Sequence, residues 1–117
     1  METLALCQKL QATKFNFSNE IELHLGIAQL LDSLNIHYQT EVVMTPEDRI
    51  DFLLPEKVGI EVKVDGSTAE VTRQLWRYAQ QEAIAQLILV TTRSKHLSIQ
   101  GPILEKPLYI VHLLTFL

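Results

Sequence analysis

Apolar residues recur at three- and four-residue spacing over residues 18–34, which predicts a helix with one hydrophobic face. Ser18 or Asn19 can cap its start. The residues of the apolar face are Leu23, Ile27, Leu30, Leu31 and Leu34. A second helix is predicted from a cap at Ser67 or Thr68 to about residue 85. Residues 1–12 also have helical composition, but they lack a clear start signal and their role is left open.

Alternating and β-branched segments predict strands over residues 38–44, 49–54 and 58–64. In 58–64 the alternation is strict, with apolar side chains on one face and Glu61 and Lys63 on the other. Residues 87–91 form a continuous apolar run, which is typical of a strand buried on both faces and parallel to its neighbour. A last strand is predicted over about 107–114, and residues 92–102 are a loop or a short helix.

Composition fits one ordered domain over residues 1–117. The chain is 47% hydrophobic and 21% charged, as in ordinary globular proteins. The predicted architecture is α/β, with a central mixed sheet flanked by helices. Its elements follow the order α-β-β-β-α-β over about 18–92 and are completed by the C-terminal strand.

Charge and cysteine content narrow the classes of function. Cys7 is the only cysteine and cannot form an internal disulfide, and no secretory leader is recognised, so a cytoplasmic location is expected. No apolar run is long enough to span a bilayer, so no membrane partner is expected. The net charge of −4 argues against a protein that coats nucleic acid with a broad basic surface, but carboxylates around a metal would also raise the negative count.

The most informative residues are Asp51, inside an apolar strand, and Glu61 and Lys63 on the following strand. Glu61 and Lys63 must point to the same side, because strand side chains alternate with period two. If the two strands form a hairpin, Asp51 comes close to both. Two neighbouring carboxylates repel unless a cation neutralises them, which predicts a hard divalent ion such as Mg²⁺ (or Mn²⁺). The alternative is a solvated sheet face, which the apolar neighbours of Asp51 disfavour.

This pattern resembles the PD-(D/E)XK (restriction-endonuclease-like) nuclease superfamily. Its motif is an Asp, a variable gap, then Asp or Glu, any residue, and Lys, on an α-β-β-β-α-β core. Ile50 stands where the motif has Pro. Gln74 and Tyr78, on one face of the second helix, are similar to the Gln-x-x-x-Tyr motif of the RecB-type branch. Small Holliday-junction-resolvase-like and virus-type replication-repair nucleases have a similar length and plan.

The resemblance implies a metal held by Asp51, Glu61, the carbonyl of Val62 and an acid of the first core helix. Helix phase selects Glu20, which borders the apolar stripe, over Glu22, which falls near the outer face at about 100° per residue. Lys63 would act on the attacking water. The residues expected to support nucleic-acid positioning are Gln74, Tyr78, Arg73 and Arg77.

The predicted function is a Mg²⁺-dependent deoxyribonuclease, directed by DNA structure or ends or targeted by a partner protein, with RNA as an open alternative. A non-catalytic nuclease-fold module for protein or nucleic-acid binding is the second hypothesis, and an ordinary α/β interaction domain is the third. A homodimer is expected, with the apolar run at 112–117 as a candidate interface or as buried core. The four histidines show no metal-ligand spacing and are interpreted as surface or locally hydrogen-bonded residues.

Overall fold

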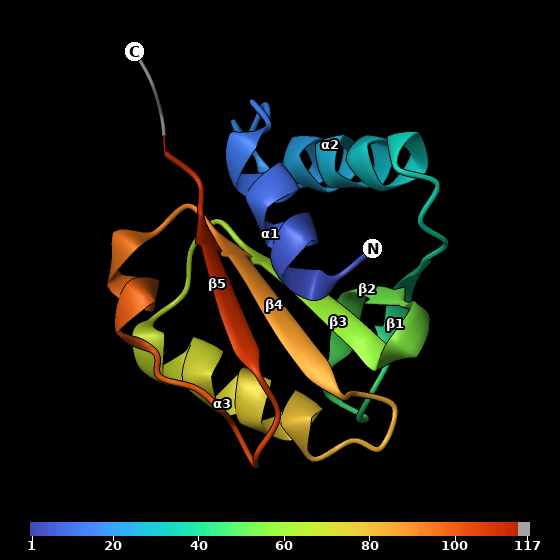
Figure 1. The fold of residues 1–117 in the computed structure, drawn as a ribbon. Coiled ribbons are helices and arrows are strands. Elements are labelled where there is room, and N and C mark those ends of the chain that lie inside the picture. The colour runs from blue at the N-terminus through green and yellow to red at the C-terminus, as the bar shows by residue number, and fades with distance from the viewer. Residues whose placement is uncertain (115–117) are drawn as a thin grey trace.

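Helices lie on both faces of one five-stranded sheet in a computed structural model that describes residues 1–114 (Figure 1). The helices are α1 (Thr3–Ala12), α2 (Glu20–Ser33) and α3 (Thr68–Ala79). The strands are β1 (Gln39–Val43), β2 (Arg49–Leu54), β3 (Val58–Lys63), β4 (Gln86–Thr91) and β5 (Leu108–His112). Short 3₁₀ helices at Pro55–Lys57 and Ser94–Ser98 lie in the connections.

The strands are ordered β1-β2-β3-β4-β5 across a mixed sheet. β1, β2 and β3 pair antiparallel, whereas β3, β4 and β5 pair parallel. Strand β4 lies between β3 and β5 and is apolar because both of its faces are covered, and Leu87 to Val90 are fully buried. The predicted α/β class, mixed sheet and buried parallel strand are confirmed.

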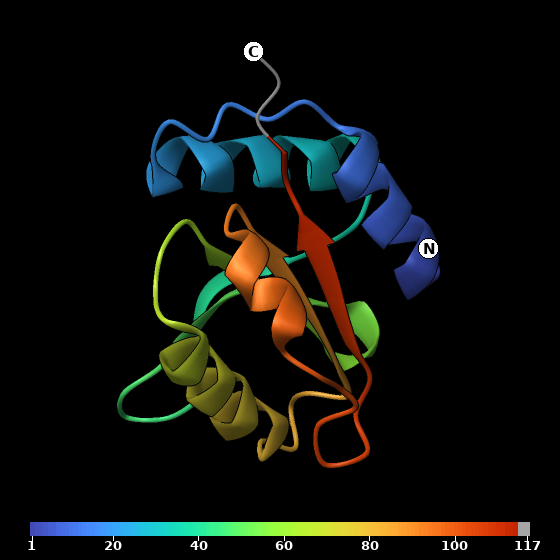
Figure 2. The same cartoon turned by 90° about the vertical axis from the view of Figure 1, so that its left-hand side faces the viewer.

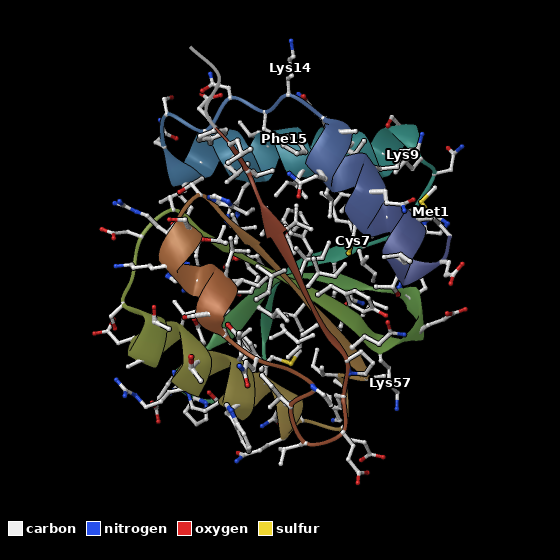
Figure 3. All side chains as sticks on the ribbon, turned by 60° about the vertical axis from the view of Figure 1, so that its left-hand side comes forward. Met1, Cys7, Lys9, Lys14, Phe15 and Lys57 are labelled. Carbon is white, nitrogen blue, oxygen red and sulfur yellow. The ribbon has the colours of Figure 1, made fainter. Side chains whose placement is uncertain are left out.

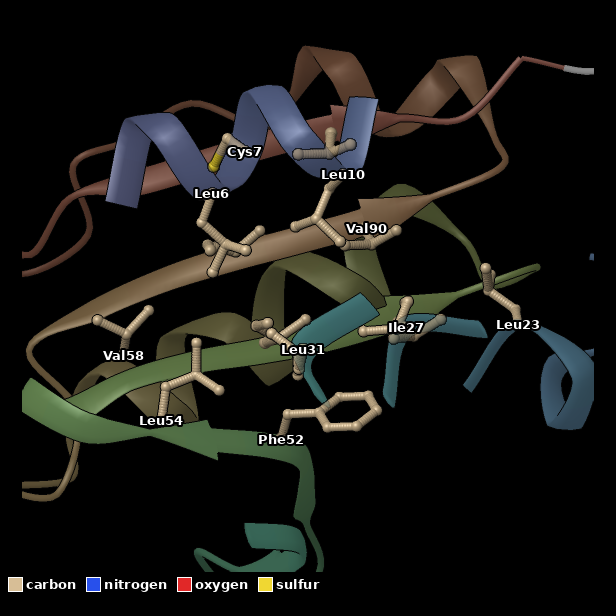
Figure 4. Packing of buried hydrophobic residues seen from close by; sticks show 14 of the residues in the cluster. Leu6, Cys7, Leu10, Leu23, Ile27, Leu31, Phe52, Leu54, Val58 and Val90 are labelled. Atoms are coloured by element: carbon tan, nitrogen blue, oxygen red, sulfur yellow. The ribbon is translucent and has the colours of Figure 1, made fainter. Parts of the chain in front are cut away.

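Two apolar clusters fill the two sides of the sheet. On one side α1 and α2 pack against the sheet through residues that include Leu10, Ile27 and Phe52 (Figures 1 and 4). On the other side of the sheet lies α3 (Figure 2). It packs through Leu75 and Tyr78. The side chain of Cys7 lies in the first cluster (Figure 3), where burial raises the pKa of its thiol to about 11. The segment 1–12 therefore forms a core helix, which sequence reasoning left open.

Helix α3 ends earlier than the sequence pattern predicts. The prediction of a helix to about residue 85 is wrong, because the last helical residue is Ala79. Ile84 turns inward to a fully buried position beside the α3 cluster, and the Ala85 N–H donates to the Lys57 carbonyl. These contacts hold the chain in place to enter β4, and a continuing helix would break them.

The alternation of β2 is broken at Asp51. Ile50 belongs to the cluster under α3, whereas Phe52 belongs to the cluster under α1 and α2. Residues two apart in a regular strand share a face, so the strand changes phase between them. Because of this change of face, the Asp51 carboxylate belongs to neither apolar cluster.

Within residues 1–114 no helix has the length and hydropathy needed to cross a membrane. Part of the C-terminal run proposed as an interface lies outside the described residues, from residue 115 onward. Of its described apolar members, Leu113 is buried and Leu114 is 53% exposed.

Candidate metal site

Asp51 lies at the point where β2 stops pairing with β3. The backbone pairs between β2 and β3 run from Leu54–Val58 to Phe52–Ile60. Beyond them the Val62 N–H of β3 bonds a side chain instead of the β2 backbone. The Val62 N–H donates to Asp51 Oδ2 over 2.7 Å. The carboxylate therefore fills the gap between the diverging strands and is fixed there by a buried hydrogen bond, which is worth more to a charged acceptor than to a neutral one.

Glu61 and Lys63 point to the same side of β3, as the alternation predicts. Lys63 Nζ lies 3.2 Å from Glu61 Oε2. The Glu61 side chain is 4% exposed, whereas that of Lys63 is 24% exposed. The ammonium thus extends from a buried carboxylate toward solvent.

Burial of two acids side by side shifts their protonation. Burial and, after it, the negative charge of Asp51 raise the pKa of Glu61 to about 8, against the opposing effect of Lys63. Burial also raises the pKa of Asp51, although the Val62 N–H opposes the shift. Near neutral pH the pair therefore retains a proton, and a cation that displaced it would bind two carboxylates at once.

Tyr78 and Gln74 of α3 hold Glu61 from the opposite layer. Tyr78 Oη lies 3.2 Å from Glu61 Oε1 and 2.9 Å from the Arg49 carbonyl. Gln74 Nε2 donates to the Tyr78 hydroxyl over 3.0 Å. Because Gln74 and Tyr78 are one turn apart on α3, a single helix face provides this chain of hydrogen bonds.

Asp48, in the β1–β2 turn, anchors the same network. Its carboxylate accepts hydrogen bonds from Arg77 Nε at 2.6 Å and Arg77 Nη2 at 3.0 Å, and from Gln74 Nε2 at 3.3 Å. The bonds from Arg77 are the main cause that holds the pKa of Asp48 below its usual range. Arg77 was predicted to support nucleic-acid positioning. In the structure its guanidinium is bonded to the buried Asp48 carboxylate.

Helix α2 contributes a histidine from the other face of the sheet. His24 Nε2 lies 3.5 Å from Asp51 Oδ1, and His24 Nδ1 lies 4.0 Å from Glu41 Oε1. One potential ligand atom from each of His24, Glu41 and Asp51 lies within 4.8 Å of the others, so this group could hold a metal ion. The His24 side chain is 23% exposed, and its interpretation as a surface or locally hydrogen-bonded residue stays a prediction. Its partners come from β1 and β2, which sequence spacing cannot show.

The donor atoms fit a divalent cation. Among the described residues His24 Nε2 is buried and has no hydrogen-bond partner. A buried polar atom left unpaired is unfavourable by about 1–3 kcal/mol, and a bound cation would remove that cost. Imidazole nitrogen and carboxylate oxygens are common metal ligands.

The two further ligands expected from the resemblance lie near the group. The Glu20 side chain is 51% exposed and its Oε1 is 3.9 Å from His24 Nε2, so it approaches the group beside His24. Glu22 faces a different groove of about 350 Å³, which it lines with Leu25 and Gln29. Val62 contacts Asp51 through its N–H, and ligation by its carbonyl stays a prediction.

A groove of about 290 Å³ opens beside Lys63. Its lining residues are Lys63, Asp65, Gly66, Glu70, Val71, Arg73, Gln74 and Arg77. His96 supports this wall, because its buried ring bonds the Thr91 hydroxyl at 2.6 Å and the Gly66 carbonyl at 2.8 Å. For His96 the expected local hydrogen bonding is confirmed.

Five of the sequence-predicted site residues come together, namely Asp51, Glu61, Lys63, Gln74 and Tyr78. Arg73 lines the adjoining groove. Sequence reasoning missed Asp48, His24 and Glu41. One signal for His24 was present, because it lies four residues after Glu20 and so shares its helix face.

Comparison with known proteins gives no relative: no family model, curated protein or solved structure matches the chain significantly.

Replacing Asp48 by Asn should lower the free energy of unfolding by about 1–3 kcal/mol, because Asn presents N–H donors to the donors of Arg77 and Gln74. Urea denaturation measures the change. Asp65→Asn is the control, since the Asp65–Arg93 pair is exposed and its loss should leave the midpoint unchanged. Equal midpoints for wild type and Asp48→Asn would show that the network is not stabilising.

Stability of the metal-free protein should fall as pH rises from about 4.5 to about 8. The pKa of Glu61 is about 8 in the folded protein against an ordinary value of 4.5, so the folded state binds this proton more tightly. The resulting stabilisation is complete below pH 4.5 and is lost as the pH rises to about 8. Glu61→Gln, which cannot ionise, should flatten this slope in urea titrations with chelator. Exposed Glu82→Gln is the control, and an unchanged slope in Glu61→Gln would contradict the shift.

Proposed function

We propose that the protein is a divalent-metal-dependent nuclease that hydrolyses DNA phosphodiester bonds on a restriction-endonuclease-like, PD-(D/E)XK fold. The observation that carries the proposal is the buried pair Asp51 and Glu61 with the Lys63 ammonium 3.2 Å from Glu61. The element order from α2 to β4 agrees with the core of that superfamily. No single motif supports the proposal as strongly as this spatial grouping.

The burial of the acids favours a metal-binding role over a structural one. Asp51 is 8% exposed and Glu61 is 3% exposed. Carboxylates are almost never this buried unless they are paired or bind a metal, and one ammonium cannot neutralise both once the retained proton is lost. A bound Mg²⁺ or Mn²⁺ would polarise a water molecule and the phosphate that the water attacks.

Lys63 has the position needed to assist that reaction. Its ammonium lies 3.2 Å from buried Glu61, and its side chain also lines the open groove. It can therefore hold the attacking water and offset charge that grows on the phosphate. In hydrolysis the water oxygen bonds to phosphorus, one phosphorus–oxygen ester bond breaks, and the departing oxygen takes up a proton. Asp51 and Glu61 would hold the cation, and Tyr78 holds Glu61 through its hydroxyl.

The groove beside Lys63 supports a phosphate-bearing substrate. Arg73 lines it and can contact a strand phosphate. Arg77 also lines it, but its bidentate bond to Asp48 gives it a primarily structural role. Because Asp65 and Glu70 also line the groove, the surface is not broadly basic, which favours cutting at a defined DNA structure or end over coating of the duplex. A homodimer stays part of the proposal.

One observation favours the alternative of a non-catalytic module. Ile21 and Leu25, one turn apart on α2, are 73% and 53% exposed. Such a pair suits contact with a protein partner. A module of this kind would keep the fold and show no cleavage of linear, circular, single-stranded or branched DNA with Mg²⁺ or Mn²⁺.

Lys63→Ala should reduce DNA cleavage by about a hundredfold or more, the range of general acid–base and electrostatic contributions. The fold and most metal binding should persist, because the ammonium ligates nothing. Gel assays with Mg²⁺ and Mn²⁺ measure the rate, and circular dichroism monitors the fold. Lys9→Ala, on the exposed side of α1, is the matched control. Cleavage at the wild-type rate in Lys63→Ala would remove the lysine from the mechanism.

Glu20→Gln should slow cleavage by about tenfold or more, equivalent to a barrier increase of about 1.4 kcal/mol. Its carboxylate approaches His24 beside Asp51, where it can reach the centre directly or through water. Glu22→Gln should be nearly silent, because Glu22 lines the separate groove with Leu25 and Gln29. The opposite ranking of the two variants would refute the assignment of Glu20.

A further inference from the structure

Glu41 has a backbone conformation that needs an explanation. Its φ angle is +52°, in the left-handed region that glutamate rarely adopts. The other non-glycine residues with positive φ lie in turns and connections: Asn35, Glu56, Lys57, Leu104 and Glu105. Glu41 alone among the described residues has this conformation inside a strand. Strain of this kind persists where the surrounding structure enforces it, and it is enriched at ligand sites.

The kink lies at the same level of the sheet as Asp51. Backbone pairing between β1 and β2 includes Thr40–Phe52 and Val42–Ile50 and skips Glu41 and Asp51 between them. Strand β2 changes face at this level, and so does β1, since Tyr38 packs with the α1 and α2 cluster and Val42 with the α3 cluster. The two strands thus break their alternation together, at the one level that carries two carboxylates.

The break brings Glu41 to a histidine with an unused nitrogen. Glu41 Oε1 lies 4.0 Å from His24 Nδ1, and Asp51 Oδ1 lies 3.5 Å from His24 Nε2. That Nε2 atom is buried and has no hydrogen-bond partner among the described residues. One ligand atom from each of His24, Glu41 and Asp51 lies within 4.8 Å of the other two, so α2, β1 and β2 each contribute one donor to the group.

We propose that Glu41 is a metal ligand, presented by a strained break in the edge strand β1, and that His24, Glu41 and Asp51 together select Mn²⁺ over Mg²⁺. Imidazole is a poor ligand for Mg²⁺, which prefers oxygen and gives up its water reluctantly, whereas first-row transition metals accept nitrogen and oxygen together. The proposal rests on the metal dependence proposed above, because Asp51 belongs to both ligand sets. It adds a ligand, a second cation subsite and a metal preference.

Calorimetry with MnCl₂ and MgCl₂ on the full chain tests the ligand set. Wild type should bind Mn²⁺ more tightly than Mg²⁺, and Glu41→Gln and Glu41→Gly should each weaken Mn²⁺ binding by about tenfold or more, as the loss of a metal-supporting group typically does. His24→Phe keeps the ring contact with Phe52, whose centroid is 5.8 Å from that of His24. It should abolish the preference for Mn²⁺.

Glu56→Gly is the matched control, because Glu56 is an exposed glutamate with a φ angle of +63° in another part of the chain. It should leave Mn²⁺ affinity unchanged. Glycine relieves left-handed strain at both positions, so Glu41→Gly and Glu56→Gly should both raise the thermal midpoint of the metal-free protein, whereas Glu41→Gln should retain the strain. A midpoint that does not rise in Glu41→Gly would contradict the strained presentation.

Wild-type Mn²⁺ affinity in both Glu41 variants would overturn the proposal, as would equal affinity of wild type for Mn²⁺ and Mg²⁺. Cleavage assays on the same samples separate the two proposals. Selective Mn²⁺ binding without cleavage would refute the nuclease and retain the site, whereas cleavage together with unchanged Mn²⁺ affinity in Glu41→Gln would retain the nuclease and refute the site.

Discussion

The hydrogen bond from the Val62 N–H to Asp51 Oδ2 occupies the gap where β2 and β3 separate. In a continuing antiparallel pair, a backbone carbonyl of β2 would take that donor. The side chain replaces it, so the β3 donor remains satisfied while the strands part. The separation leaves room for a second buried acid, Glu61, on the neighbouring strand. Without this bond Asp51 would lose the backbone donor that opposes the effect of burial on its pKa, and its neutral form would be favoured further.

The helices on the two faces of the sheet contribute different chemical groups to this gap. From the α3 side, Arg77 and Gln74 donate to Asp48, Gln74 also donates to the Tyr78 hydroxyl, and Tyr78 bonds Glu61. From the α2 side comes the imidazole of His24. The two apolar clusters hold these helices at fixed positions on the sheet. Packing that is remote from the polar groups therefore determines their spacing, which explains why the centre lies between the layers.

Sequence periodicity correctly predicted which side chains share a face of a strand or helix. It failed where contacts between distant segments or an unusual backbone conformation determine the structure. Strict alternation in β3 placed Glu61 and Lys63 on one side, and four-residue spacing placed Gln74 with Tyr78. The early end of α3 was missed because the buried position of Ile84 and the bond from Ala85 to Lys57 are tertiary contacts. Nothing local in the sequence indicates that Asp48, in the β1–β2 turn, binds Arg77. Glu41 gave no signal, because a left-handed glutamate in a strand has no sequence signature.

The balance of charge at the centre constrains the order of events in the proposed reaction. Four carboxylates, those of Asp51, Glu61, Glu41 and Glu20, lie around the group, whereas Arg77 is committed to Asp48. Lys63 is the basic side chain paired with Glu61, and one ammonium cannot offset the four acids. A DNA phosphate would therefore be repelled from the metal-free centre. Divalent cations held by these carboxylates would reverse the local sign and would displace the proton retained by the buried acids. On the proposed function, cations must bind before the substrate or together with it, and this order reconciles a net charge of −4 with a polyanionic substrate.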